Sequence, residues 1–143
     1  MDVMELKSLS EAQVAEVVEL MGELDPEIPV TGEMVRKVLR TEGAHFFAAV
    51  DEEGRIVGCA TLCVFVSPTG VKASVEDVVV SEKCRGQHLG RRLMEHVIEY
   101  ARREIGAVDL HLTSRPHRVE ANALYRSLGF EPKETNVYVM KIL

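Results

Sequence analysis

The spacing of apolar residues along the chain alternates between a helical and a strand-like period. Within residues 10–40, 85–106 and 118–128, apolar side chains recur every three or four positions, whereas residues 44–80 carry apolar runs of strand length. The first spacing is typical of amphipathic helices, and short apolar runs between turn residues are typical of strands. The pattern therefore predicts helices towards both ends of the chain and a group of strands in its middle.

The first two predicted helices carry start and stop signals. Ser10 begins the first helix, and Gln13 completes a Ser-x-x-Gln capping box. Asp25 and Pro26 end this helix, and Thr31 can cap a second one. The buried faces are predicted at Val14, Val17, Val18, Met21 and Leu24, and at Met34, Val35, Val38 and Leu39.

The complete order of predicted elements is β-α-α-β-β-β-α-β-α-β. Strands are expected at residues 3–9, 44–50, 55–66, 71–80, 108–112 and 136–142, and the later helices at 89–105 and 118–128. Strands cluster in the middle and alternate with helices at the ends. This order predicts an α/β fold with a mixed, mostly antiparallel sheet and helices on both faces.

Composition narrows the class of protein. A chain of 143 residues with 46% hydrophobic content predicts one globular domain over residues 1–143. The net charge of −6 and the absence of tryptophan disfavour a nucleic-acid partner. There is no apolar run of ~18 residues and no signal-peptide pattern at the N-terminus, so we expect a cytoplasmic protein with no membrane partner.

Cysteine and histidine spacings do not indicate a metal or redox site. Cys59 and Cys63 lie four residues apart in a predicted strand, which fits neither a CxxC redox pair nor a zinc knuckle. With Cys84 they are expected to be reduced packing residues, since disulfides are rare in cytosolic proteins. The histidines in the predicted strands and helix, His45, His96 and His111, lack metal-ligand spacing, so no metal is expected.

The most distinctive stretch is the turn of residues 85–90, Arg-Gly-Gln-His-Leu-Gly, between a run of valines and a basic helix. Glycines allow close backbone approach to a ligand, and the first amides of a helix lie at the positive end of its dipole. Arg85, Arg91 and Arg92 add charge that suits phosphate oxygens. The turn therefore favours pyrophosphate binding, and the alternative is a polar turn with surface arginines.

A second stretch is EANALYRSLGF, residues 120–130, with Ala121, Leu124, Tyr125 and Leu128 on one predicted helical stripe. Asn122 lies one helical turn before Tyr125, so both side chains can face one cleft. The alternative is core packing with Tyr125 half buried.

These two stretches, CRGQHLGRRL and ANALYRSLGF, in this order of elements resemble the signature motifs of the GNAT superfamily of acetyl-CoA-dependent N-acetyltransferases. The family turn pattern, Arg/Gln-x-x-Gly-x-Gly/Ala, is matched at Arg85 and Gly90. His88 stands where the middle glycine is usual. The resemblance covers essentially the whole chain.

The resemblance implies an acetyl-CoA co-substrate and a role for each matching residue. Main-chain groups of Val78, Val79 and Val80 would pair with the pantetheine arm. Asn122 would hydrogen-bond this arm, and Tyr125 would protonate the departing thiolate. The amides that would hold the pyrophosphate are those of Arg85, Gly86, Gln87, His88, Leu89, Gly90 and Arg91.

The acceptor amine also needs a base, because an amine with a pKa of ~10.4 is almost entirely protonated at pH 7. Glu76 is the candidate, since similar acids occur at this strand position in the family that the chain resembles. In a regular strand Asp77 would point to the opposite face, so only one of the two carboxylates should face the cleft. A bulge at this position could make Asp77, and not Glu76, the one that faces it.

The acceptor is not determined by the sequence. Residues 1–53 carry 13 acidic and 4 basic residues, which favours a cationic amine such as a polyamine, a lysine side chain or an aminosugar, or reflects solvated helix faces. Arg115 favours instead a substrate with a carboxylate, and Arg118 could meet a cofactor phosphate.

Two other classes of protein remain open. One is a non-catalytic acyl-CoA-binding or sensing module, in which His88 marks a degraded site. The other is a generic nucleotide-binding domain, which would require the Lys of a Walker loop or a GxGxxG motif. The resemblance also suggests a homodimer, with NVYVMKIL, residues 136–143, as an edge that pairs with a partner.

Overall fold

The computed structural model describes residues 1–106 and 108–143. The chain divides into two compact units, Met1–Thr113 and Ser114–Leu143, and each is described by itself.

The first unit contains a five-stranded sheet with the strand order β1-β2-β3-β4-β5. Neighbouring strands are antiparallel except β4 and β5, which are parallel. The strands are β1 (Asp2–Glu5), β2 (Ala44–Val50), β3 (Ile56–Ser67), β4 (Gly70–Val80) and β5 (Leu110–His111). The mixed α/β fold and the central hairpins expected from the sequence are confirmed.

The helices of this unit are α1 (Glu11–Leu24), α2 (Gly32–Arg40) and α3 (Leu89–Tyr100). Short helical turns lie at η1 (Glu82–Cys84) and at η2 (Ala101–Ile105), which continues α3 as a π-helix. The predicted capping box is present, because Ser10 Oγ accepts from the Gln13 amide at 3.1 Å and Gln13 Oε1 accepts from the Ser10 amide at 3.1 Å. Gly106, with φ 93°, ends the π-helix where a helical stop was expected.

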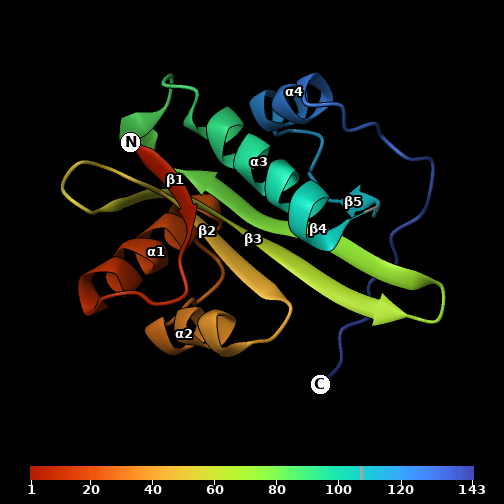
Figure 1. The fold of residues 1–143 in the computed structure, drawn as a ribbon, viewed down its shortest axis with the longest axis horizontal. Helices are drawn as coiled ribbons and strands as arrows, with labels where there is room; N and C mark the ends of the chain where they lie inside the picture. Colours follow the sequence, from red (N-terminus) through yellow and green to blue (C-terminus); the bar gives the residue numbers. More distant parts are fainter. Residues whose placement is uncertain (107) are drawn as a thin grey trace. The chain divides into compact units, whose positions relative to one another are not determined.

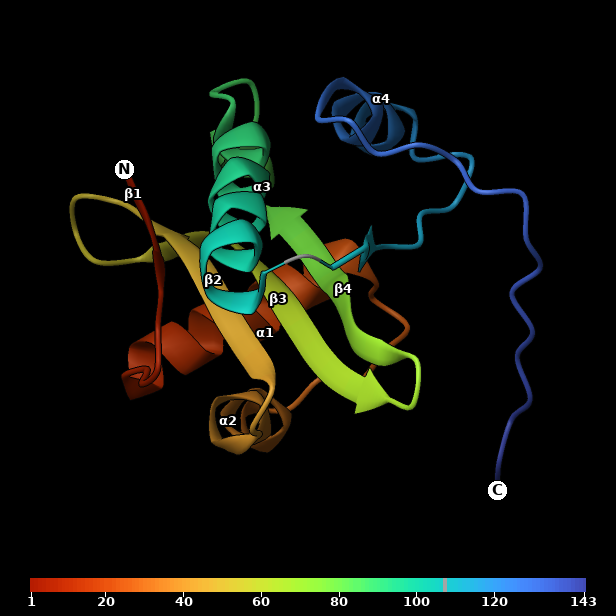
Figure 2. The same ribbon diagram turned by 45° about the vertical axis from the view of Figure 1, so that its right-hand side comes forward.

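Consecutive phenylalanines in β2 show that helices cover both faces of the sheet. Phe46 belongs to a core formed with α1 and α2, whereas the Phe47 ring lies 5.1 Å from Tyr100 of α3, centroid to centroid. Adjacent strand residues point to opposite faces, so α3 packs opposite α1 and α2. Figure 2 shows α3 in front of the sheet and α1 behind it.

The second unit contains one helix, α4 (Val119–Ser127), followed by an irregular segment. The strand predicted at residues 136–142 is wrong for this structure, since the described residues there form no ladder and Tyr138 and Val139 are 88% and 90% exposed. The alternation of its side chains suits a strand, but a strand also needs a neighbour for its backbone N–H and C=O groups. Figure 1 shows this segment as an extended trace.

Candidate functional site

The edge of β4 that faces away from β3 is only partly paired. β3 pairs with β4 from Gly70 to Val80, but the described β4–β5 ladder contains two pairs, at Ala73 and Ser74. The edge from Val75 to Val80 therefore extends beyond β5. Such an edge presents backbone donors and acceptors that an extended ligand can pair with, as an added strand would. The three valines assigned to the pantetheine arm, Val78 to Val80, end this edge.

A β-bulge interrupts β4 beside these valines. In the β3–β4 register Thr61 pairs with Glu76 and Cys59 pairs with Val79, so one residue of β3 lies opposite two residues of β4. Asp77 is within the bulge and has a φ of 53°, a left-handed value that is uncommon outside glycine and that aspartate, asparagine and histidine adopt more often than other residues. The bulge therefore changes the direction of side chains at the position expected for catalysis.

The bulge corrects the prediction that Asp77 faces away from Glu76. Glu76 shares its face with Thr61, since directly paired residues of antiparallel strands lie on one face. Asp77 lines a cavity together with Thr61 and Phe46, which places it on the same face. A one-residue insertion shifts the alternation, and both carboxylates now lie on the side covered by α1 and α2.

The two carboxylates have different surroundings. The hydroxyl of Ser74 donates a hydrogen bond to Glu76 Oε1 at 2.7 Å. Partial desolvation and the neighbouring charge of Glu76 raise the pKa of Asp77 above its ordinary value. Burial is also the main reason why the pKa of the Cys59 thiol is raised to about 12, with a smaller contribution from Asp77. Cys59 is therefore an uncharged packing residue at neutral pH, as expected from the sequence.

Two backbone amides of the turn after β4 donate hydrogen bonds to β3 and to α1. The Ser81 amide donates to the Val57 carbonyl at 2.8 Å, and the Glu82 amide donates to Glu23 Oε1 at 2.9 Å. These bonds fix the point at which the chain leaves the sheet and enters the predicted phosphate-binding turn.

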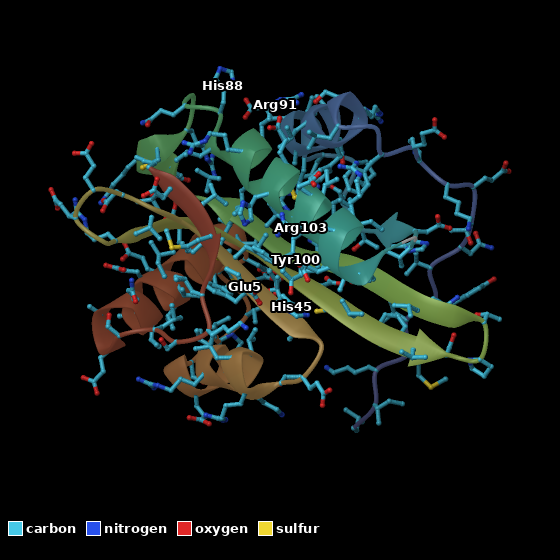
Figure 3. All side chains as sticks on the ribbon, in the orientation of Figure 1. Glu5, His45, His88, Arg91, Tyr100 and Arg103 are labelled. Atoms are coloured by element: carbon cyan, nitrogen blue, oxygen red, sulfur yellow. The ribbon has the colours of Figure 1, made fainter. Side chains whose placement is uncertain are left out.

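His88 adopts the conformation expected of the glycine that it replaces. It has φ 58° and ψ 25°, in the left-handed region, and is the N-cap of α3 without a side-chain capping bond. Gly86 also has a positive φ, of 84°. Left-handed backbone costs a non-glycine residue about 1–2 kcal/mol, and histidine is among the residues that tolerate it better. The backbone path of a glycine-containing turn is thus retained, with His88 at its exposed tip (Figure 3).

The first turn of α3 provides backbone N–H groups at the end of the predicted phosphate-binding turn. The helix begins at Leu89, and its first intrahelical bond is from the Arg92 amide to the His88 carbonyl at 3.1 Å. The amides of Leu89 and Gly90 lie before Arg92 in the chain, and amides in the first turn of a helix have no intrahelical acceptor. The Leu89 side chain is buried and anchors the helix. The arginines have structural partners, since Arg91 pairs with Glu95 and Arg92 donates to the Met1 carbonyl at 2.6 Å.

A cavity of about 190 Å³ lies on the face of the sheet that α1 and α2 cover. Nine of its twelve lining residues are apolar, and the others are Asp25, Thr61 and Asp77. All of them belong to the first unit. Sequence patterns did not indicate this cavity, because its wall combines α1, α2 and three strands.

The two residues predicted from the second motif lie on α4. The Asn122 side chain donates to the Arg115 carbonyl at 3.1 Å and thereby holds the segment that precedes the helix. Tyr125 is buried, and its ring lies 6.0 Å from that of Phe130 in an edge-to-face arrangement. Burial raises the pKa of Tyr125, while Arg118 lowers it. The phenol therefore keeps its proton at neutral pH.

A polar cluster that sequence patterns did not indicate joins β1, β2 and α3. His45 Nδ1 lies 2.9 Å from Glu5 Oε2 and 3.3 Å from the Tyr100 hydroxyl. Partial burial is the main reason that the pKa of Tyr100 is raised, followed by the charge of Glu5. Figure 3 shows the three side chains gathered near the end of α3, away from the His88 turn. The cluster ties α3 to the sheet.

The described part of the chain has neither a metal-binding cluster nor a membrane-spanning helix. No group of three or more histidine, cysteine, aspartate or glutamate side chains is arranged to hold a metal ion. Among the same residues, no helix is both long and apolar enough to cross a membrane.

The fold and the site together describe a mixed α/β protein in which a partly unpaired strand edge leads into a turn at the start of a helix. The family model described as Acetyltransferase (GNAT) family matches residues 14–130. The chain therefore belongs to the GNAT family of acetyltransferases.

Relatives of this chain carry acetyltransferase names. Glucosamine 6-phosphate N-acetyltransferase 1 of Oryza sativa subsp. japonica is 30% identical over 127 residues, which cover 82% of this chain and 74% of the relative. Streptothricin acetyltransferase of Streptomyces lavendulae is 36% identical over 84 residues, which cover 59% of this chain and 43% of the relative.

Solved structures show the same fold. A putative acetyltransferase from Agrobacterium tumefaciens str. C58 has a TM-score of 0.83 at 26% identity, covering 99% of this chain and 100% of the other. A probable acetyltransferase has a TM-score of 0.82 at 22% identity, with 100% and 99% coverage, and this likeness concerns the fold alone.

Proposed function

We propose that residues 1–143 form one acetyltransferase domain that moves an acetyl group from acetyl-CoA to a primary amine by direct attack in a ternary complex. The amine nitrogen forms a bond to the acetyl carbon, and the C–S bond breaks. An ammonium acceptor loses two protons, of which one ends on the coenzyme thiol and one is released. The observation that carries this proposal is the open edge of β4 leading directly into the turn at the start of α3.

The coenzyme would follow this edge and turn. Main-chain groups of Val78, Val79 and Val80 would pair with the amide groups of the pantetheine arm, since the described β5 pairs end at Ser74. The amides of residues 85–91 would hold the pyrophosphate at the positive end of the α3 dipole. Asn122 would contribute a hydrogen bond to the pantetheine.

We assign proton removal from the acceptor to Glu76. At pH 7 an amine with a pKa of ~10.4 is neutral in only about one molecule in a few thousand, which corresponds to roughly 4–5 kcal/mol. A carboxylate that takes the proton removes much of this barrier. Glu76 is exposed and lies on the α1/α2 face, so a water molecule can connect it to the amine.

We assign protonation of the leaving thiolate to Tyr125. A thiol has a pKa of ~8.5 and an ordinary tyrosine ~10, so transfer needs no large adjustment. Its burial keeps the phenol protonated, which is the state that a general acid requires.

A primary amine acceptor is supported by the names of the relatives, which act on glucosamine 6-phosphate and on streptothricin. We also propose that the protein is cytoplasmic and forms a homodimer. Support for the dimer comes from the exposed apolar segment that includes Val137, Val139 and Ile142.

Calorimetric titration with acetyl-CoA, with ATP and NAD as controls, tests the coenzyme. Selective binding of acetyl-CoA is expected, and no binding at millimolar concentration would refute the enzyme assignment. An amine screen by thiol release then separates catalysis from a non-catalytic acyl-CoA-binding module. The pH–rate profile of Glu76→Gln should differ from that of the wild type, and an unchanged profile would exclude this residue as the base.

A further inference from the structure

The cavity beneath α1 and α2 adjoins the residues proposed for the reaction. Asp77 forms part of its wall, and Val78, the first valine assigned to the pantetheine arm, is the next residue of β4. The cavity and the open β4 edge therefore meet at the bulge. A molecule in the cavity would have one end at Asp77, where the bulged strand leaves its regular path.

Most of the cavity wall is hydrocarbon. α1 contributes Val17, Met21 and Leu24, and α2 contributes Met34, Val35 and Val38. Val17 and Val35 are 2% and 6% exposed, whereas Met34 is 47% exposed and lies at the opening. Water gains few hydrogen bonds in such a space, and burial of an apolar group there favours binding by roughly fourfold per methylene.

The volume limits the size of the occupant. A cavity of about 150 Å³ holds a benzene molecule. The 190 Å³ here therefore suits a branched alkyl chain of about five carbons or a single ring. A disaccharide or a folded peptide is much larger than this space.

The charged residues of the wall are all acidic. Asp25 and Asp77 line the cavity, and its lining contains no lysine, arginine or histidine. One oxygen of Asp25 already accepts the Glu27 amide at 3.1 Å. Within the described residues, Asp77 has neither a hydrogen bond to its carboxylate nor an ion pair, so both of its carboxylate oxygens are available to a ligand.

We propose that the acceptor is a primary amine on a small apolar body, with this body in the cavity and the ammonium group paired with Asp77. This inference rests on the proposed acetyl transfer and specifies its substrate class. Asp77 binds and orients the amine, and Glu76 accepts the proton as the C–N bond forms. Aminosugar phosphates are disfavoured, since the wall offers no cation for a phosphate and few groups for hydroxyls.

A matched series of amines tests the substrate class by thiol release at saturating acetyl-CoA. Isopentylamine and benzylamine are of a size that fills the cavity. Propylamine and ethanolamine form a matched pair, in which a methyl group of the first is replaced by a hydroxyl group in the second. Glucosamine and spermidine represent polar acceptors. With a gain of roughly fourfold per buried methylene, isopentylamine should exceed ethanolamine by about 50-fold in kcat/KM. A preference for glucosamine or spermidine would overturn the inference.

Variants test the two ends of the site. Asp77→Asn retains a side chain that tolerates a positive φ, and it should raise KM for isopentylamine about 10- to 100-fold with a smaller change in kcat. Asp77→Glu should recover part of this loss. Met34→Gln at the opening should lower the preference for isopentylamine, whereas Lys37→Gln, exposed on the same helix and outside the cavity lining, should not.

A binding measurement without turnover separates this inference from the proposed function. In protein with ¹³C-labelled methionine methyl groups, isopentylamine should shift the signals of Met21 and Met34 but not that of Met94, which lies outside the cavity lining. Unmoved signals would overturn the cavity assignment. Shifted signals without acetylation of any amine would refute the proposed function alone.

Discussion

Glu76 and Asp77 are neighbours in β4, yet their side chains lie on the same face of the sheet. The register jumps from the Thr61–Glu76 pair to the Cys59–Val79 pair, and Asp77 takes up the extra residue with a φ of 53°. Two carboxylates brought together in this way repel each other, which is why Glu76 contributes to the raised pKa of Asp77. Two carboxylates placed close together at this cost are typical of a functional site.

The raised pKa of Asp77 predicts a pH-dependent stability. Because its pKa is higher in the folded protein, the folded state holds more protons than the unfolded chain above the unfolded value of ~3.9. Stability is therefore lost as pH rises through the interval between the two values. Asp77→Asn removes this loss, so its Tm should exceed that of the wild type at pH 7.5 and approach it near pH 4. Glu52→Gln, in the β2–β3 turn, is the control, and a lower Tm for Asp77→Asn at pH 7.5 would contradict the prediction.

Tyr125→Phe should lower kcat while leaving acetyl-CoA binding intact. General acid catalysis contributes about 10²-fold or more, and a thiolate, as a good leaving group, places the loss towards the lower end. Because burial raises the pKa of Tyr125, the wild-type rate should not fall with pH until the solution is strongly alkaline. Stopped-assay kcat values and calorimetric Kd values check both points, and an unchanged kcat would exclude the general-acid role.

His88→Gly should keep the turn and remove its backbone strain. Relief of left-handed strain is offset in part by the larger entropy of glycine in the unfolded chain, so a gain in stability of up to ~1 kcal/mol is expected. His88→Val should weaken acetyl-CoA binding, because a β-branched residue tolerates φ 58° poorly. Thermal melts and acetyl-CoA titrations of both variants test this, and equal behaviour of the two would contradict it.

Phe47→Ala should destabilise the first unit strongly. Phe47 is 0% exposed and its ring contacts those of His96 and Tyr100, and truncation of a buried phenylalanine costs about 3–5 kcal/mol. Phe65→Ala is the matched control on β3, since Phe65 is 57% exposed. Denaturant unfolding should show a change for Phe65→Ala of about 0.5 kcal/mol or less.

Removal of residues 136–143 should convert the proposed homodimer to a monomer. These residues include Tyr138 and Val139, which are 88% and 90% exposed and carry a strand-like alternation that suits pairing with a second copy. Light scattering coupled to size-exclusion chromatography gives the mass directly. A wild-type mass of one chain, 15.9 kDa, would refute the dimer.

Much of the fold could be predicted from local patterns. The capping box at Ser10, the hairpin turns and the glycine stop at Gly106 are local signals, and the structure confirms each of them. The strand at residues 136–142 was predicted from the same kind of pattern and is wrong here, because pairing depends on a neighbouring strand that no local pattern supplies.

The candidate site also combines features that short motifs predict with features that depend on the tertiary structure. The turn at residues 85–90 and the Asn122–Tyr125 spacing are short motifs, so the sequence by itself determined the family and the position of the turn proposed to bind the pyrophosphate. The left-handed conformation of His88, the facing of Asp77 and the apolar cavity were decided only by the tertiary structure. The physical reason is distance along the chain: a bulge is defined by the register between two strands, and a cavity by side chains from α1, α2, β2, β3 and β4 that meet only after folding.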